Sequence, residues 1–90
     1  MIIRRIVHRQ MNEIRACYAT RLTTAPNLEG RVVVKFIISG TTGGVSTVSA
    51  SGLDDTVDRC VEREFRKLVF PKSDTGGDVT VDAYPITFHR

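Results

Sequence analysis

Residues 78–88 read Asp-Val-Thr-Val-Asp-Ala-Tyr-Pro-Ile-Thr-Phe, and their pattern is that of a strand at the edge of a sheet. Apolar and polar side chains alternate from Val79 to Ala83, the alternation breaks at Tyr84-Pro85, and it resumes at Ile86. Proline cannot donate a backbone hydrogen bond to a neighbouring strand, so it indicates an edge or a bulge. Another extended chain can pair with such an edge. The break divides the stretch into residues 79–83, which we expect to pair with the chain's own sheet, and the residues from 84 onward. Which of these two parts meets a partner is left open.

The length and composition predict one globular domain over residues 1–90. The chain has 90 residues, of which 41% are hydrophobic and 26% are charged, as in ordinary soluble domains. No run approaches the roughly 20 apolar residues that span a bilayer. Arginines at 4, 5 and 9 interrupt the first residues, which therefore do not resemble a signal peptide.

Positive charge gathers in the N-terminal third of the chain. Residues 1–35 carry seven Lys or Arg against two acids, whereas residues 36–90 carry six against eight. A basic segment of this kind is found in proteins that bind nucleic acid or anionic lipid, but we favour the simpler interpretation of a solvated helix face, because no aromatic residues are interleaved with the arginines and no nucleic-acid-binding motif is present. The alternative function is therefore a basic nucleic-acid-binding α+β domain that uses Arg4, Arg5, Arg9, Arg15 and Arg21.

Two segments have the periodicity of amphipathic helices. In 2–22, apolar residues recur at steps of three and four, and the helix should end near Thr24 because Pro26 disfavours helical geometry before it. The second helix is expected over 52–69, with acids in its first turns, bases in its last and Pro71 after it. The two apolar stripes consist of Ile3, Ile6, Val7, Met11, Ile14, Cys17, Tyr18 and Leu22, and of Leu53, Val57, Cys60, Val61, Phe65 and Leu68.

A hairpin lies between these helices. Residues 31–39 are β-branched and aromatic, which predicts a central strand with Val32, Val34, Phe36 and Ile38 on the core face. The turn at 40–44 contains Gly43-Gly44, lacks the Lys-Ser/Thr pair of a phosphate loop, and leads into a strand over 45–51. The fold class is therefore α+β in the order α-β-β-α-β, a three-stranded antiparallel sheet with two helices packed on one face.

The two cysteines fall on the apolar stripes of the two helices. Cys17 and Cys60 match neither metal-ligand spacing nor a C-x-x-C motif. Helices packed about 8–10 Å apart bring such residues within reach of each other. We expect a disulfide, which would imply an oxidising compartment, with two reduced core thiols as the alternative. A redox-active pair is a third hypothesis, although buried thiols are usually inert.

Candidates for catalysis are few. His8 lies on a helix face and His89 is next to the last residue, and neither has a predicted partner. No set of ligands has metal-binding spacing. The sequence therefore predicts no enzyme activity, no catalytic residue, no metal and no cofactor.

Short motifs along nearly the whole chain resemble the TonB C-terminal domain superfamily, and most closely the AgmX/PglI/GltJ-type C-terminal domain of the myxobacterial gliding-motility machinery. They occur in the order Ile14-Arg15-Ala16-Cys17-Tyr18, Pro26-Asn27-Leu28-Glu29-Gly30-Arg31-Val32, Gly43-Gly44-Val45, Ser51-Gly52-Leu53, Cys60-Val61, Phe70-Pro71, Gly76-Gly77 and Tyr84-Pro85-Ile86-Thr87-Phe88. No single motif is specific, but the ordered set is.

This resemblance implies a periplasmic domain of an inner-membrane protein, taken from a longer membrane-anchored chain. It implies a role in energy transduction, transport or gliding motility, in which the domain binds an extended segment of an outer-membrane or periplasmic protein. The missing N-terminal part would contact a proton-channel motor complex; nucleic acid is not implied, and a homodimer is possible within this family. The partner-binding residues expected on this basis are Val79, Val81, Ala83, Tyr84, Pro85, Ile86 and Phe88.

Overall fold

The structure, a computed structural model, describes residues 2–89 as an α+β arrangement of three helices and one three-stranded antiparallel sheet. The helices and strands follow one another as α1 (Ile2–Arg9), α2 (Met11–Leu22), β1 (Gly30–Ile38), β2 (Val45–Ser51), α3 (Asp55–Arg66) and β3 (Val79–Phe88). The molecule is elongated, with principal extents of 46 × 20 × 18 Å. Within residues 2–89, none of the three helices combines the length and the apolar composition of a membrane span.

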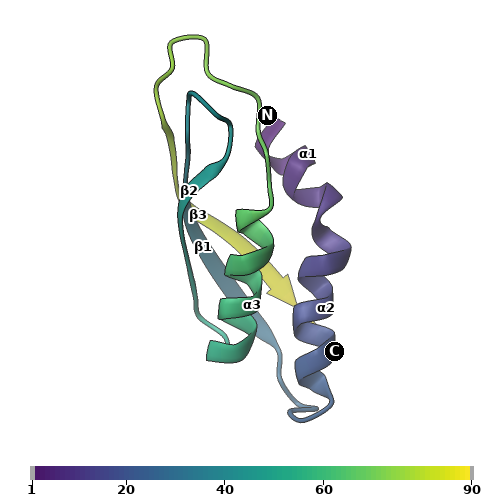
Figure 1. The fold of residues 1–90 in the computed structure, drawn as a ribbon. Coiled ribbons are helices and arrows are strands. Elements are labelled where there is room, and N and C mark those ends of the chain that lie inside the picture. Colours follow the sequence, from purple (N-terminus) through teal and green to yellow (C-terminus); the bar gives the residue numbers. More distant parts are fainter. Residues whose placement is uncertain (1, 90) are drawn as a thin grey trace.

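The sheet has the order β2-β1-β3, so β1 is central and the other two strands are edges. All three helices lie over one face of this sheet, as Figure 1 shows. The predicted core face of β1 is confirmed, because Val32, Val34, Phe36 and Ile38 are buried whereas Lys35 is exposed. The sheet and the apolar stripes of the helices therefore share one core.

The prediction of one uninterrupted helix over 2–22 is wrong, because the helix breaks at Gln10. The backbone of Gln10 has φ −95° and ψ 1°, and its N–H donates to the carbonyl of Val7 at 3.0 Å, which is a tighter turn than an α-helix. Its side-chain amide donates to Glu64 on α3 at 2.9 Å. The break in the helix thus coincides with a contact between distant segments, and residues 2–22 contain no Gly or Pro that would predict it.

The irregularity of the last strand lies before the predicted break. Val34 pairs with Tyr84 and Phe36 pairs with Val81, so two residues of β3 stand opposite one residue of β1. The extra residue lies between Val81 and Tyr84, and it moves Tyr84 onto the core face. The expected division of the strand at Tyr84 is therefore wrong, since β3 pairs with β1 on both sides of the bulge.

The helix predicted over residues 52–69 corresponds to α3, which is shorter at both ends. Asp54 caps its first turn by accepting a hydrogen bond from the Val57 N–H at 3.1 Å, so the helix begins after Gly52 and Leu53. At the other end the chain leaves the helix after Arg66, and the Phe70 N–H donates to the carbonyl of Gly43 at 2.7 Å. Phe70 then stacks on Phe36, with ring centroids 6.0 Å apart. This packing on the sheet favours an extended chain before Pro71.

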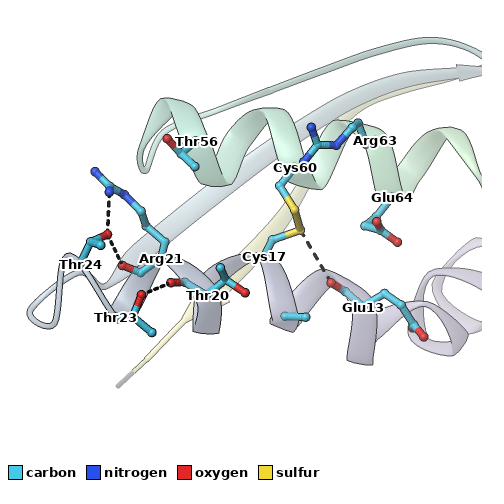
Figure 2. Close-up of a pocket in the computed structure, with 11 residues that line it drawn as sticks. Glu13, Cys17, Thr20, Arg21, Thr23, Thr24, Thr56, Cys60, Arg63 and Glu64 are labelled. Carbon is cyan, nitrogen blue, oxygen red and sulfur yellow. Dashed lines mark hydrogen bonds between the residues drawn. A yellow bond between two sulfur atoms is a disulfide. The ribbon is translucent and has the colours of Figure 1, made fainter.

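Cys17 and Cys60 are joined by a disulfide, with their Cα atoms 5.7 Å apart. Figure 2 shows the bridge between α2 and α3. Cys17 is 6% exposed and Cys60 is half-buried, as expected from their places on the two apolar stripes. The bridge links two of the three helices that lie over the sheet, α2 and α3.

Candidate interaction edge

A pair of charged side chains on α3 covers part of the outer edge of β2. The carboxylate of Glu62 accepts a hydrogen bond from the Ala50 N–H at 2.8 Å, and the guanidinium of Arg59 donates to the Ala50 carbonyl at 2.8 Å. Arg59 and Glu62 also form an ion pair at 2.8 Å. Only 8% of Glu62 is exposed, and the ion pair with Arg59 compensates the charge of this buried carboxylate. We call these two residues the edge clamp.

The other end of β2 is covered by the segment after α3. Val69 forms a β-bridge with Gly44, next to the hydrogen bond from Phe70 to Gly43. An incoming strand would therefore have to displace this segment at one end of β2 and the edge clamp at the other.

The hydrogen bonds of the edge clamp also indicate which backbone groups of β3 point toward β1 and which point outward. Because Ala50 uses its N–H and C=O on the clamp, its pair with Val34 carries no ladder hydrogen bonds. Val34 therefore turns its N–H and C=O toward Tyr84. Alternation then turns the backbone of Pro85 and Thr87, which pair with Val33 and Arg31, away from β1.

Proline is accommodated in β3 for this reason. At Pro85 the missing N–H faces the open side, so no hydrogen bond to β1 is lost. Thr80, opposite Ile37, also turns its backbone outward. Within residues 2–89, no side chain covers this edge in the way that the edge clamp covers β2. The outer edge of β3 thus offers N–H and C=O groups at Thr80 and Thr87 and a C=O group at Pro85.

The predicted partner-binding residues divide into two groups. Ile86 and Phe88 are 6% and 4% exposed, and the Phe88 ring stacks on Tyr18 with centroids 4.9 Å apart. Tyr84 is half-buried against Phe36 and Phe65, and Val81 is half-buried as well. By the same alternation, these four residues turn their backbone groups toward β1, so they offer a partner neither free hydrogen-bonding groups nor much side-chain surface. The exposed members of the predicted set are Val79, Ala83 and Pro85.

A groove runs between β3 and the two N-terminal helices. One part, of about 390 Å³, is lined by Arg4, His8, Met11 and Arg15 on the helices and by residues 83–88 on the strand. We call this part the basic groove. The part beside it, of about 610 Å³, is lined by Ile3 and Arg4 and by residues 79–84.

The helix residues of the basic groove were not predicted as part of this site. The sequence predicted Arg4 and Arg15 only as candidate nucleic-acid contacts, and Met11 only as part of an apolar stripe. These helix residues face an edge strand because of the order of the strands in the sheet, which places β3 and not β2 beside α1 and α2. Local sequence patterns carry no such information.

A second hollow lies over the disulfide, between α2 and α3 (Figure 2). It has a volume of about 500 Å³, and its lining includes Cys17, Cys60, Arg21 and threonines of both segments. Arg21 donates to Asp54 at 3.2 Å and to Thr24 at 2.8 Å. The described residues contain no free cysteine, so a reactive thiol is not present in this bridged state.

Hydrogen bonds to carboxylates shape the electrostatics at both ends of α3. The Val57 N–H, with help from Arg21, lowers the pKa of Asp54 below 3.8 against a smaller opposing effect of burial. At the other end, burial raises the pKa of Glu64, but hydrogen bonds from Gln10 and Lys67 together lower it below 4.5. Both carboxylates are thus held in the charged form by contacts that stabilise the fold.

No group of three or more His, Cys, Asp or Glu side chains within residues 2–89 is placed to hold a metal ion. Both histidines are exposed, His8 at the basic groove and His89 after the end of β3.

Comparisons with protein-family models, with curated proteins and with solved structures find no significant match to this chain.

Proposed function

We propose that this domain is a protein-interaction module that binds an extended segment of another protein by strand addition at the outer edge of β3. The observation that carries the proposal is the difference between the two edges of the sheet. The edge of β2 is covered at its two ends by the edge clamp and by the Val69 bridge. The outward-turned residues of β3 instead line the open groove, Pro85 and Thr87 in the basic groove and Thr80 in the part beside it. Strand addition uses free backbone groups of this kind.

We further propose that the domain is a TonB C-terminal-like domain of the AgmX/PglI/GltJ type, in the periplasmic part of an inner-membrane energy-transducing or gliding-motility protein. The ordered motifs of the sequence support this assignment. The Cys17–Cys60 bridge supports an oxidising compartment such as the periplasm. The same bridge argues against the alternative of a cytoplasmic nucleic-acid-binding domain. The partner would be an outer-membrane or periplasmic protein.

The test uses seven-residue peptides of one design, Thr-X-Val-X-Thr-X-Val, in which X is Gln, Glu or Lys. These alternating sequences favour an extended conformation. We expect at least one of them to change the backbone amide chemical shifts of residues 79–88 in a titration followed by NMR. The proposal fails if none of the three binds, or if the shifts lie only in other parts of the sheet.

A pair of variants at Thr87 tests the backbone mechanism. Thr87 is exposed and turns its N–H outward, so Thr87→Pro removes one donor of the open edge without removing a hydrogen bond to β1. We expect Thr87→Pro to keep the circular dichroism spectrum of the wild type and to weaken peptide binding at least about fivefold, the value of one hydrogen bond. Thr87→Val keeps the N–H and should bind as the wild type does. Equal affinities of the two variants would contradict strand addition at this edge.

A further inference from the structure

We infer that the segment bound at β3 is acidic, with carboxylate side chains at alternate positions that face α1 and α2 in the basic groove. This inference rests on the proposed strand addition and goes beyond it by naming the chemistry of the partner. It also names the part of β3 that the partner meets, which is residues 83–88.

The charge of the basic groove is uncompensated within the described residues. Arg4 and Arg15 are exposed, and neither forms an ion pair within residues 2–89. His8 lies between them on the same wall, and Met11 supplies apolar contact. No Asp or Glu lines this part of the groove. A segment with carboxylates on one side would therefore find complementary charge and no like charge here.

The helix side of the basic groove, from Arg4 to Arg15, is about as long as the strand residues 83–88 that line its other side. At 1.5 Å per helical residue, Arg4 and Arg15 are separated by about 17 Å along the helices. At 3.4 Å per strand residue, residues 83–88 also cover about 17 Å. Side chains on one face of an added strand repeat every 6.8 Å or so, and the step from Arg4 to His8 is about 6 Å. Carboxylates at positions i, i+2 and i+4 of the partner would thus lie along the wall.

The neighbouring half of the groove is less suited to an acidic segment. Asp82 lines it together with Arg4, so a carboxylate there would meet a like charge. The other simple occupant, a second copy of this chain paired through β3, would bring two basic walls together. Repulsion between these walls disfavours a symmetric dimer at this edge.

The experiment measures the affinities of the Gln, Glu and Lys peptides by fluorescence anisotropy in 50 mM salt, with a 20-base-pair DNA duplex as a further probe. It compares the variants Arg4→Glu/Arg15→Glu and Arg5→Glu/Arg9→Glu. Both pairs are exposed on the N-terminal helices and change the net charge equally, but Arg5 and Arg9 do not line the groove. The second pair is therefore the matched control for long-range electrostatics.

We expect the Glu peptide to bind the wild type about tenfold more tightly than the Gln peptide, and the Lys peptide to bind more weakly still. Arg4→Glu/Arg15→Glu should weaken the Glu peptide about tenfold or more and reverse the preference toward Lys, whereas the control pair should change it less than about threefold.

Each other outcome has a distinct meaning. If the three peptides bind at 79–88 with equal affinity, or if the two pairs of variants weaken the Glu peptide equally, the acidic partner is excluded and strand addition stands. If no peptide shifts residues 79–88, strand addition fails as well. Binding of the DNA duplex that requires Arg4 and Arg15, or a dimer in sedimentation that the Glu peptide does not dissociate, would assign the groove to another occupant and overturn the inference.

Discussion

Removal of the Cys17–Cys60 bridge should cost this domain a large share of its stability. The bridge joins residues 43 positions apart, so its loss frees a long loop in the unfolded chain. In the chain-entropy account, a loop of this length corresponds to about 4 kcal/mol at 25 °C. A domain of this size has about 5–15 kcal/mol of stability in total. The variant Cys17→Ala/Cys60→Ala should therefore fold only marginally or with much reduced stability.

The assay is equilibrium unfolding in urea, followed by circular dichroism at 222 nm. With a slope near 1 kcal/mol per molar for a small domain, the midpoint should fall by about 3–4 M, or the melting temperature by about 15–30 °C. Reduced wild-type protein should lose a similar amount, and reductant should have no effect on the alanine variant. A loss below about 1 kcal/mol, or equal midpoints for oxidised and reduced wild type, would refute the role given to the bridge.

Two further predictions concern a helix cap and a glycine. The pKa of Asp54 is lowered below 3.8 mainly by the hydrogen bond from Val57, so its contribution to stability is present above that pH and is lost as the pH falls through the folded-state pKa. Melting temperatures from pH 6 to pH 2 should thus fall less steeply for Asp54→Asn than for the wild type, and parallel curves would contradict this. Gly43 has φ +79°, and a Cβ there would lie 1.9 Å from the Phe70 carbonyl oxygen. Gly43→Ala should therefore lower the free energy of unfolding by about 2 kcal/mol or more, whereas Gly77→Ala, whose Cβ would come no closer than 3.4 Å to a neighbour, should change it by less than about 0.5 kcal/mol in a urea titration.

Apolar periodicity predicted the layout of this protein well. The strand 45–51 has the predicted bounds, and the first strand differs by one residue at each end. The stripes of the helices, including Cys17 and Cys60, face the core as expected. These features follow from side-chain direction along helices and strands, which depends on local geometry alone.

The deviations have a common origin in contacts between distant segments. Gln10 bonds to Glu64, Phe70 packs on Phe36, and the bulge near Ala83 places Tyr84 against the core. Each contact joins residues far apart in the chain, so no local pattern announces it. Helix bounds and the position of the bulge were therefore mispredicted where such contacts outweigh local preference.

The proline-containing stretch 78–88 was recognised from its residues as an edge strand, because Pro85 within an alternating pattern indicates an edge or a bulge. That this edge is open while the edge of β2 is covered depends on the tertiary structure. The edge clamp needs α3 to lie against β2, and the basic groove needs α1 and α2 to lie beside β3. The sequence thus determined the type of each element. Packing of helices on a three-stranded sheet decided which backbone edge is covered and which charges surround the open one.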